Sequence, residues 1–284
     1  MPLSFKLRKK PAVSGVSGDG AQGAEPMLEM SFLDHLEELR WRIIKGLVGV
    51  LVGAVVCMFF WEWVIDVLLL GPTRADFFMY EVLRLNLEEF IIQNRTVPGQ
   101  FFVMIGTVGV VGVIIGAPVL IYQLWAFIEP GLYPHEKSKM RFTAVWASFF
   151  FALGVSFGYL ILTPVALSFF AGLSLSSQII NEFDVTNYFS MVTMWALGAG
   201  LLFELPVVVY LLSKIGLLNP AILRKSRRFA LIIILVIAAF LTPPDPMSQI
   251  IMAIPLLLLY QGSIWISGVA VRRRAKEMKE ALGE

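Results

Sequence analysis

The chain has 284 residues, of which 57% are hydrophobic and 15% are charged, with a net charge of +2. This composition excludes an ordinary soluble domain, because several apolar runs are long enough to cross the roughly 30 Å hydrocarbon core of a bilayer. One cysteine, Cys57, excludes an internal disulfide and a cysteine metal cluster, and two histidines, His35 and His135, argue against a histidine-rich metal site. We therefore expect an integral membrane protein without a metal or cofactor.

The N-terminal region has two parts. Residues 1–29 are polar, rich in Gly, Ala and Ser, and carry a basic patch, which predicts a disordered tail. Met30 to Arg42 (MSFLDHLEELRWR) has apolar side chains at helical spacing. It predicts an amphipathic helix lying at the membrane surface and running into a first span at about Ile43 to Trp63.

The next segment, Gly71 to Gly99, mixes acidic and large apolar side chains. It predicts one amphipathic helix resting on the far face of the membrane. A second span follows at about Phe101 to Phe127, with glycines at three- and four-residue steps that allow another helix to approach closely. Pro118 inside this span predicts a kink.

Four more spans are predicted from apolar runs separated by turn and charge signals. The fifth has only 13 residues, or roughly 20 Å of helix, which is short for a full crossing. A compact turn joins it to the sixth, and a basic tail, residues 272–284, follows the membrane domain of residues 30–271. The four spans are at about Ala144–Pro164, Tyr188–Leu212, Phe229–Leu241 and Met247–Val271.

Lysines and arginines gather in alternate loops. With six spans, the region up to Lys45 holds seven, the second loop three, the fourth five and the tail five, whereas the first loop holds three and the third and fifth none. Because cytoplasmic loops collect these residues, both termini are predicted to be cytoplasmic. The predicted fold class is an all-α integral membrane protein with six transmembrane helices, N-in and C-in, with kinked helices and two short C-terminal spans.

The most heavily marked short segment is Trp125 to Lys137 (WAFIEPGLYPHEK), between the second and third spans. Its Pro-Gly step favours a turn, and Pro134 cannot occupy a helix interior. We expect a stiff, non-helical connection that holds Glu129 and Glu136 beside the bilayer on the cytoplasmic face. The alternative is a tight helix–helix connection with no further role.

Two carboxylate-bearing segments, HLEELR and EPGLYPHE, are thus expected on one face. Such a cluster suits a cationic ligand, because a carboxylate can hold a planar guanidinium through two hydrogen bonds. The alternative is that Glu38 pairs with Arg40 and Glu136 pairs with Lys137. Exposed pairs of that kind contribute only about 0–1 kcal/mol.

Several motifs carry a resemblance to a known family. They are HLEELRWR before the first span, then APVLIYQLWAFIEPGLYPHEK, FELPVV, LTPPDPMSQ and AIP, in that order. By these motifs the chain resembles the TatC family, the six-span core subunit of the twin-arginine protein translocase, over about Met30 to Val271. It departs from the family pattern in a longer first external loop and an extended N-terminal tail.

The resemblance implies a receptor for signal peptides that carry consecutive arginines. By this resemblance, Glu38 and Glu136 hold the two guanidinium groups. Arg40, Phe127 and Glu129 shape the site, with Phe127 offering an aromatic face to the cations. Lysine presents a compact, strongly hydrated ammonium and cannot make the same two-pronged contact.

Glu204 lies inside the fourth span, two residues before Pro206. A carboxylate in a span is costly and by default marks a functional or interhelical polar site. One interpretation is a structural hydrogen bond that pins a kink. The resemblance favours a polar patch facing a groove where signal or partner helices bind.

The external turn between the fifth and sixth spans carries Thr242, Asp245 and Gln249. The resemblance implies that TatA- and TatB-type single-span subunits dock there, and the local alternative is a proline-rich turn capped by Asp245. It further implies a complex with several copies of the chain in the bacterial inner membrane. That complex exports folded proteins, draws on the proton gradient and binds no nucleic acid.

Two other classes stay open. One is a proton-coupled secondary transporter that uses Glu204, although the two halves of the chain lack the matched broken helices typical of internal-repeat transporters. The other is an intramembrane enzyme. Both histidines are predicted outside the spans, which leaves no Ser–His or paired-Asp arrangement within them. We therefore expect a receptor subunit without catalytic residues.

Overall fold

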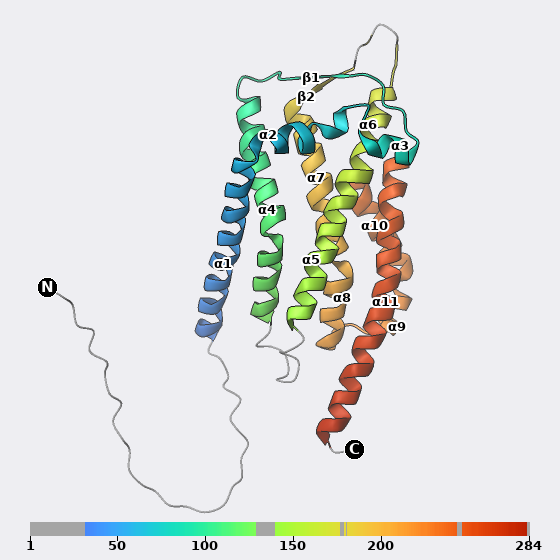
Figure 1. Ribbon diagram of the computed structural model, residues 1–284. Coiled ribbons are helices and arrows are strands. Elements are labelled where there is room, and N and C mark those ends of the chain that lie inside the picture. The colour runs from blue at the N-terminus through green and yellow to red at the C-terminus, as the bar shows by residue number, and fades with distance from the viewer. Residues whose placement is uncertain (1–31, 129–139, 177–178, 180, 243–245, 283–284) are drawn as a thin grey trace, which may run out of the picture.

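Long helices make up most of the structure, a computed structural model that describes residues 32–128, 140–176, 179, 181–242 and 246–282. Figure 1 shows them side by side, with short elements gathered over one end of the bundle. We call this end the cap end. We call the opposite end, where α1 (Phe32–Phe59) begins and α11 (Pro246–Leu282) ends, the terminal end.

Most of the remaining elements are helical. Between α1 and α11 the chain forms α2 (Trp61–Trp63), the π-helix η1 (Val64–Leu69), the 3-10 helix η2 (Gly71–Thr73), α3 (Phe78–Leu83), β1 (Ile91–Gln93), α4 (Gly99–Ile128), α5 (Met140–Phe157), the π-helix η5 (Gly158–Leu162), α6 (Thr163–Gly172), β2 (Glu182–Asp184), α7 (Val185–Phe203), α8 (Leu205–Lys214), α9 (Pro220–Lys225) and α10 (Arg227–Leu241).

The helices confirm a six-span membrane protein. Among the described residues, five helical stretches are long and apolar enough to cross a membrane. α10 adds a sixth helix of 15 residues, or about 22 Å, so the short fifth span is confirmed. The sixth span is not short, because the candidate span Pro246–Lys276 has 31 residues, and α11 continues beyond it as one helix of 37 residues. The five stretches are Leu36–Phe59, Gly99–Ile128, Phe142–Gly172, Val185–Lys214 and Pro246–Lys276.

The prediction of a separate helix lying at the membrane surface is wrong in one respect. The described part of that segment, from Phe32 to Arg42, belongs to α1 and continues into the first span without a break. No glycine or proline interrupts the sequence between them, so nothing in the chain turns the helix into the membrane plane. Its polar first turns therefore extend along the axis of the span at the terminal end.

α1 and α4 run antiparallel with their backbones in close contact. A Cβ added to Gly53 would lie 2.6 Å from the carbonyl oxygen of Gly112, and one added to Gly116 would lie 2.8 Å from the Cα of Val50. Only glycine permits this approach. The predicted glycine seam is thus confirmed for Gly112 and Gly116, whereas Gly109 has no such neighbour within 4 Å.

α5 and α7 pack in the same way, since a Cβ on Gly154 would lie 2.5 Å from the carbonyl oxygen of Ala199. The third span is longer than predicted, because α5, η5 and α6 continue it to Gly172. The fourth span is interrupted at Glu204, between α7 and α8. The short α10 is held by a buried cluster in which Ala238 packs with side chains of α7 and α11, including Phe203 and Met252.

The prediction of one amphipathic helix between Gly71 and Gly99 is wrong. The only α-helix in this segment is α3, with six residues, which ends where Arg84 adopts a left-handed backbone (φ 53°). The chain then runs without regular secondary structure to β1 and packs apolar side chains, such as Phe90, against a core cluster that contains Tyr188. Long-range packing therefore replaces a local helix at the cap end.

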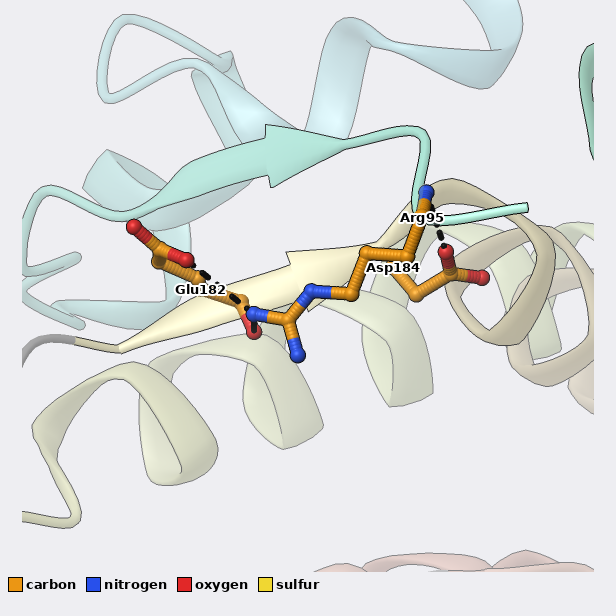
Figure 2. A network of polar contacts seen from close by, with 3 residues as sticks. All are labelled: Arg95, Glu182 and Asp184. Atoms are coloured by element: carbon orange, nitrogen blue, oxygen red, sulfur yellow. Dashed lines mark hydrogen bonds and ion pairs between the residues drawn. The ribbon is translucent and has the colours of Figure 1, made fainter. Parts of the chain in front are cut away.

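β1 and β2 form a two-stranded parallel sheet that the sequence pattern does not predict. Ile91 lies opposite Glu182 and Gln93 opposite Asp184. So short a sheet is marginal by itself, and Arg95 adds contacts across it (Figure 2). Its guanidinium donates to the Glu182 carboxylate (3.1 Å) and carbonyl (3.4 Å), and its backbone N–H donates to the Asp184 carboxylate (3.0 Å).

Three buried or half-buried tyrosines fix the turn at the end of the first span. Each hydroxyl donates to a carbonyl of a different residue where η1 and η2 leave the regular helix pattern. Because the tyrosines come from α3, η5 and α7, the turn is tied to three separate parts of the fold. The pairs are Tyr80 with Pro72, Tyr159 with Leu68 (2.6 Å) and Tyr188 with Leu69.

Acid is expected to loosen the β1–β2 cap through Asp184. This side chain caps α7 by accepting the N–H groups of Thr186 (2.9 Å) and Asn187 (3.4 Å). The Thr186 hydroxyl, followed by the Arg95 N–H, holds the pKa of the Asp184 carboxyl below its ordinary value. Its stabilisation is therefore complete above the ordinary aspartate pKa of about 4 and is lost as the pH falls through the lower folded value.

Hydrogen exchange of residues 91–98, corrected for the intrinsic pH dependence, measures this opening. Protection in the wild type should fall at acid pH, and Asp184→Asn should be less protected at neutral pH and respond less to acid. Asp76→Asn, which removes an exposed carboxylate from the same cap-end segment between η2 and α4, is the matched control and should behave as wild type. Identical pH profiles for wild type and Asp184→Asn would contradict the assignment.

Candidate functional site

Part of the predicted guanidinium site comes together at the terminal end. In the antiparallel register of α1 and α4, Gly46 faces Leu120. Continuing that register brings Glu38 level with the last turn of α4, which carries Phe127. Arg40 lies exposed on the same end of α1. Two segments that are about 90 positions apart in the sequence therefore meet at one surface.

Glu38 is the best-defined member of this group. Its Oε1 atom accepts from Nε of Arg42 at 2.9 Å and also from Nη2 of Arg42. Both side chains are mostly buried, with 21% of Glu38 and 23% of Arg42 exposed. The alternative pairing of Glu38 with Arg40 is therefore wrong. Glu38 pairs instead with Arg42, at the i, i+4 spacing that brings side chains together on one face of a helix.

Arg42 is a residue that the site prediction misses. The Glu-to-Arg spacing of four in HLEELRWR is the signal that could have identified it. By holding one oxygen of Glu38, Arg42 fixes the orientation of the carboxylate. The other oxygen, Oε2, is buried and has no hydrogen-bond partner among the described residues.

An unpaired, buried carboxylate oxygen is costly for the free protein. A cationic N–H donor that reaches Oε2 of Glu38 would remove that cost and gain a charge-assisted hydrogen bond. The arrangement therefore suits a guanidinium ligand. The other two carboxylates predicted for the site, Glu129 and Glu136, lie outside the described residues.

Glu204 occupies the break between α7 and α8. Its backbone carbonyl accepts the N–H groups of Val207 (2.9 Å) and Val208 (3.0 Å). Its side chain makes no capping hydrogen bond, and its buried Oε1 has no partner in the described part of the chain. The interpretation that the Glu204 side chain pins the kink by a hydrogen bond therefore lacks the bond it needs.

Thr242 and Gln249 lie near the cap end, where α10 leads to α11 (Figure 1). The buried Thr242 hydroxyl donates to the carbonyl of Ala238 at 2.8 Å, and Nε2 of Gln249 donates to the carbonyl of Leu235 at 3.2 Å. Both side chains thus bind α10. Asp245 lies outside the described residues.

The predicted residues therefore form separate groups rather than one site. Glu38, Arg40 and Phe127 share the terminal end, Glu204 lies within the fourth span, and Thr242 and Gln249 lie towards the cap end. The first group suits a cationic ligand from solution, whereas the others are suited to contacts within the membrane.

Known proteins match most of the chain. A family model described as Sec-independent protein translocase protein (TatC) matches residues 34–255. The chain is 35% identical over 256 residues to the Sec-independent protein translocase protein TatC of Blattabacterium sp. subsp. Periplaneta americana (strain BPLAN), covering 84% of this chain and 95% of that protein. It is 35% identical over 253 residues to the protein of that name from Aquifex aeolicus (strain VF5), covering 89% and 100%.

Solved structures match as well. A structure described as "Crystal Structure of Twin Arginine Translocase Receptor- TatC" aligns with a TM-score of 0.66 at 35% identity, over 83% of this chain and 99% of that chain. A second, described as the same receptor in DDM, aligns with a TM-score of 0.68 over 82% and 99%.

Proposed function

We propose a detailed function for this chain from the premise that it belongs to the TatC family of Sec-independent protein translocase proteins. As a member it is a multi-pass membrane protein and a core subunit of the twin-arginine translocase. The proposal concerns which residues bind the signal, which contact partners, and how the chain lies in the membrane.

The proposed signal-peptide site is at the terminal end, with Glu38 and Glu136 each binding one guanidinium of a consecutive-arginine pair. Arg40, Phe127 and Glu129 shape this site. The single observation that carries the proposal is the buried Oε2 of Glu38, which has no partner among the residues the structure describes, while Arg42 holds the other oxygen in place. A planar guanidinium supplies donors that fit it, whereas a lysine ammonium cannot make the same fork.

The proposed partner contacts are Glu204 within the membrane and Thr242, Asp245 and Gln249 near the cap end. Their partners would be TatA- and TatB-type single-span subunits, with several copies of this chain in one complex and membrane lipid around it. Folded precursors would then be exported with energy from the proton gradient. The unpaired Oε1 of Glu204 supports a role in binding a polar group from another helix.

We place the terminal end in the cytoplasm of a bacterium, with the chain in the inner membrane. Every described lysine and arginine except those of the segment between η2 and α4 lies on a helix or turn near the terminal end (Figure 1), and cytoplasmic loops collect such residues. We assign no catalytic step and no nucleic-acid binding to the chain. The proton-coupled transporter that would use Glu204 gains no support from the family match.

Export in cells that lack their own TatC-type subunit tests the proposal. The chain, produced with its own single-span partners, should export a folded reporter that carries an Arg-Arg signal and should leave the Lys-Lys reporter inside. Membrane insertion of the chain is checked separately by its presence in the membrane fraction. A correctly inserted, assembled chain that exports neither reporter would overturn the proposal.

A further inference from the structure

A cavity of about 730 Å³ lies among α1, α4, α5 and α7, in the half of the bundle nearer the cap. This volume falls within the range of about 300–1,000 Å³ that is typical of small-molecule sites. Some lining side chains are exposed on the surface of spanning helices, namely Val56 and Ile115. The cavity therefore opens towards the hydrocarbon of the bilayer.

One buried hydroxyl in the cavity wall has no partner among the described residues. Most lining residues are apolar, Ser156 is exposed, and the hydroxyls of Tyr159 and Thr193 already donate to backbone carbonyls. Thr107 also lines the cavity and is 3% exposed, yet its Oγ1 has no hydrogen-bond partner in the described part of the chain. A helical threonine commonly bonds to the carbonyl four residues earlier, and Thr107 does not. An unsatisfied buried hydroxyl costs free energy that a ligand can recover.

Physical chemistry limits what can fill this space. Water can bond to the few hydroxyls of the wall, but it cannot fill a cavity of this size whose remaining lining is apolar, because a buried water needs two to four polar partners. The hydrocarbon chains of surrounding lipids are as apolar as the wall, so the wall alone gives no preference over the bilayer. The buried Thr107 hydroxyl adds selectivity for a ligand that brings an acceptor to it.

The depth of Thr107 matches one such acceptor. α4 has 30 residues, about 45 Å, which is close to the full thickness of a bilayer with its headgroups. Thr107 lies eight residues from the start of α4, or about 12 Å along the axis. That level is just inside the hydrocarbon boundary of the cap-side leaflet, where the ester carbonyls of phospholipids meet their acyl chains.

We propose that this cavity is a lipid site that binds one acyl chain of a phospholipid from the cap-side leaflet. The chain fills the apolar space between the paired helices α1 and α4 and the paired helices α5 and α7. The Thr107 hydroxyl donates a hydrogen bond to the ester carbonyl of that lipid. This site is separate from the guanidinium site and does not depend on it.

The chain carries its own reporter for this test, because its one cysteine, Cys57, is buried and lines the cavity. Full-length protein is delipidated in detergent and titrated with an ester-linked phospholipid or its ether-linked analogue, which lacks the carbonyls. The rate of Cys57 labelling by an apolar maleimide is measured. The ester lipid should slow labelling at about two- to tenfold lower concentration than the ether lipid, the contribution of one hydrogen bond.

Thr107→Val should remove the difference between the two lipids while leaving the apolar volume nearly unchanged. Thr193→Val is the matched control, since it deletes a cavity hydroxyl that is already bonded within its helix. It should keep the ester preference. Val110→Trp should slow labelling without lipid by filling the cavity, whereas Val145→Trp, exposed on α5, should not.

Several results would overturn the proposal. Equal protection by ester and ether lipids would remove the role of the carbonyl. An ester preference that survives in Thr107→Val would remove the role of the hydroxyl. Protection of Cys57 by an Arg-Arg signal peptide and by neither lipid would make the cavity a peptide site instead.

Discussion

A peptide with consecutive arginines is expected to bind the wild-type chain and to lose about five- to 150-fold in affinity when Glu38 is changed to Gln, or Glu136 to Gln. Each substitution removes one charged acceptor for a guanidinium, a loss of about 1–3 kcal/mol. The Lys-Lys twin of the peptide should bind weakly to wild type and to both variants, because an ammonium does not make the two-pronged contact. Isothermal titration with detergent-solubilised protein measures these affinities.

Glu37→Gln provides the matched control, since it removes an exposed carboxylate one residue away on α1 and should leave binding unchanged. Arg42→Gln should weaken Arg-Arg binding as well, because Arg42 orients Glu38 through two hydrogen bonds. If Arg-Arg and Lys-Lys peptides bind equally, and Glu38→Gln changes neither, the terminal-end carboxylates are not the receptor site.

The second large effect is expected at the contact between α1 and α4. Gly116→Ala should lower the free energy of unfolding by about 1–3 kcal/mol, as is typical of overpacked cores. The added Cβ would lie 2.8 Å from both the Cα and the backbone N of Val50 and 2.9 Å from the carbonyl carbon of Gly49. Because these are backbone atoms, the two helices must move apart. The midpoint of thermal unfolding in a mild detergent measures the loss.

Gly109→Ala is the control in the same helix. A Cβ at Gly109 meets no atom within 4 Å, and alanine favours a helix over glycine by up to about 1 kcal/mol. The expected result is an unchanged or slightly raised unfolding midpoint. Equal losses in Gly116→Ala and Gly109→Ala would show that the close approach of α1 to α4 does not limit stability.

Apolar run length predicts the spans well, because each membrane helix satisfies its own backbone hydrogen bonds and needs only enough apolar residues to cross. The same logic fails for the cap. Between Gly71 and Gly99 the pattern of acidic and apolar side chains fits a helix, yet the segment forms only short elements, η2, α3 and β1, joined by turns and irregular chain. There the deciding interactions are long-range: β1 pairs with β2, and Arg95 binds Glu182 and Asp184, about 90 positions away.

Part of the candidate site could likewise be predicted from the sequence, and part of it could not. Residue types and motif order identify Glu38 and Phe127, and their meeting follows from the antiparallel packing of α1 and α4. Helical spacing could also have identified Arg42, a local partner of Glu38. The Thr107 hydroxyl, which has no partner among the described residues, could not be anticipated, because a threonine in an apolar helix has a ready local acceptor. Only the packed structure shows that this acceptor is not used.

The sequence by itself determines that this chain is a six-span membrane protein of the TatC family, with its basic residues gathered at one end. Hydrophobic length, charge placement and motif order are properties of short segments, so they can be read without knowing which segments meet. Only the tertiary structure decides how the cap folds, which oxygen of Glu38 has no partner among the described residues, and where a cavity lies among α1, α4, α5 and α7. These features depend on contacts between residues far apart in the chain, where the packing of one helix against another sets which polar groups find partners.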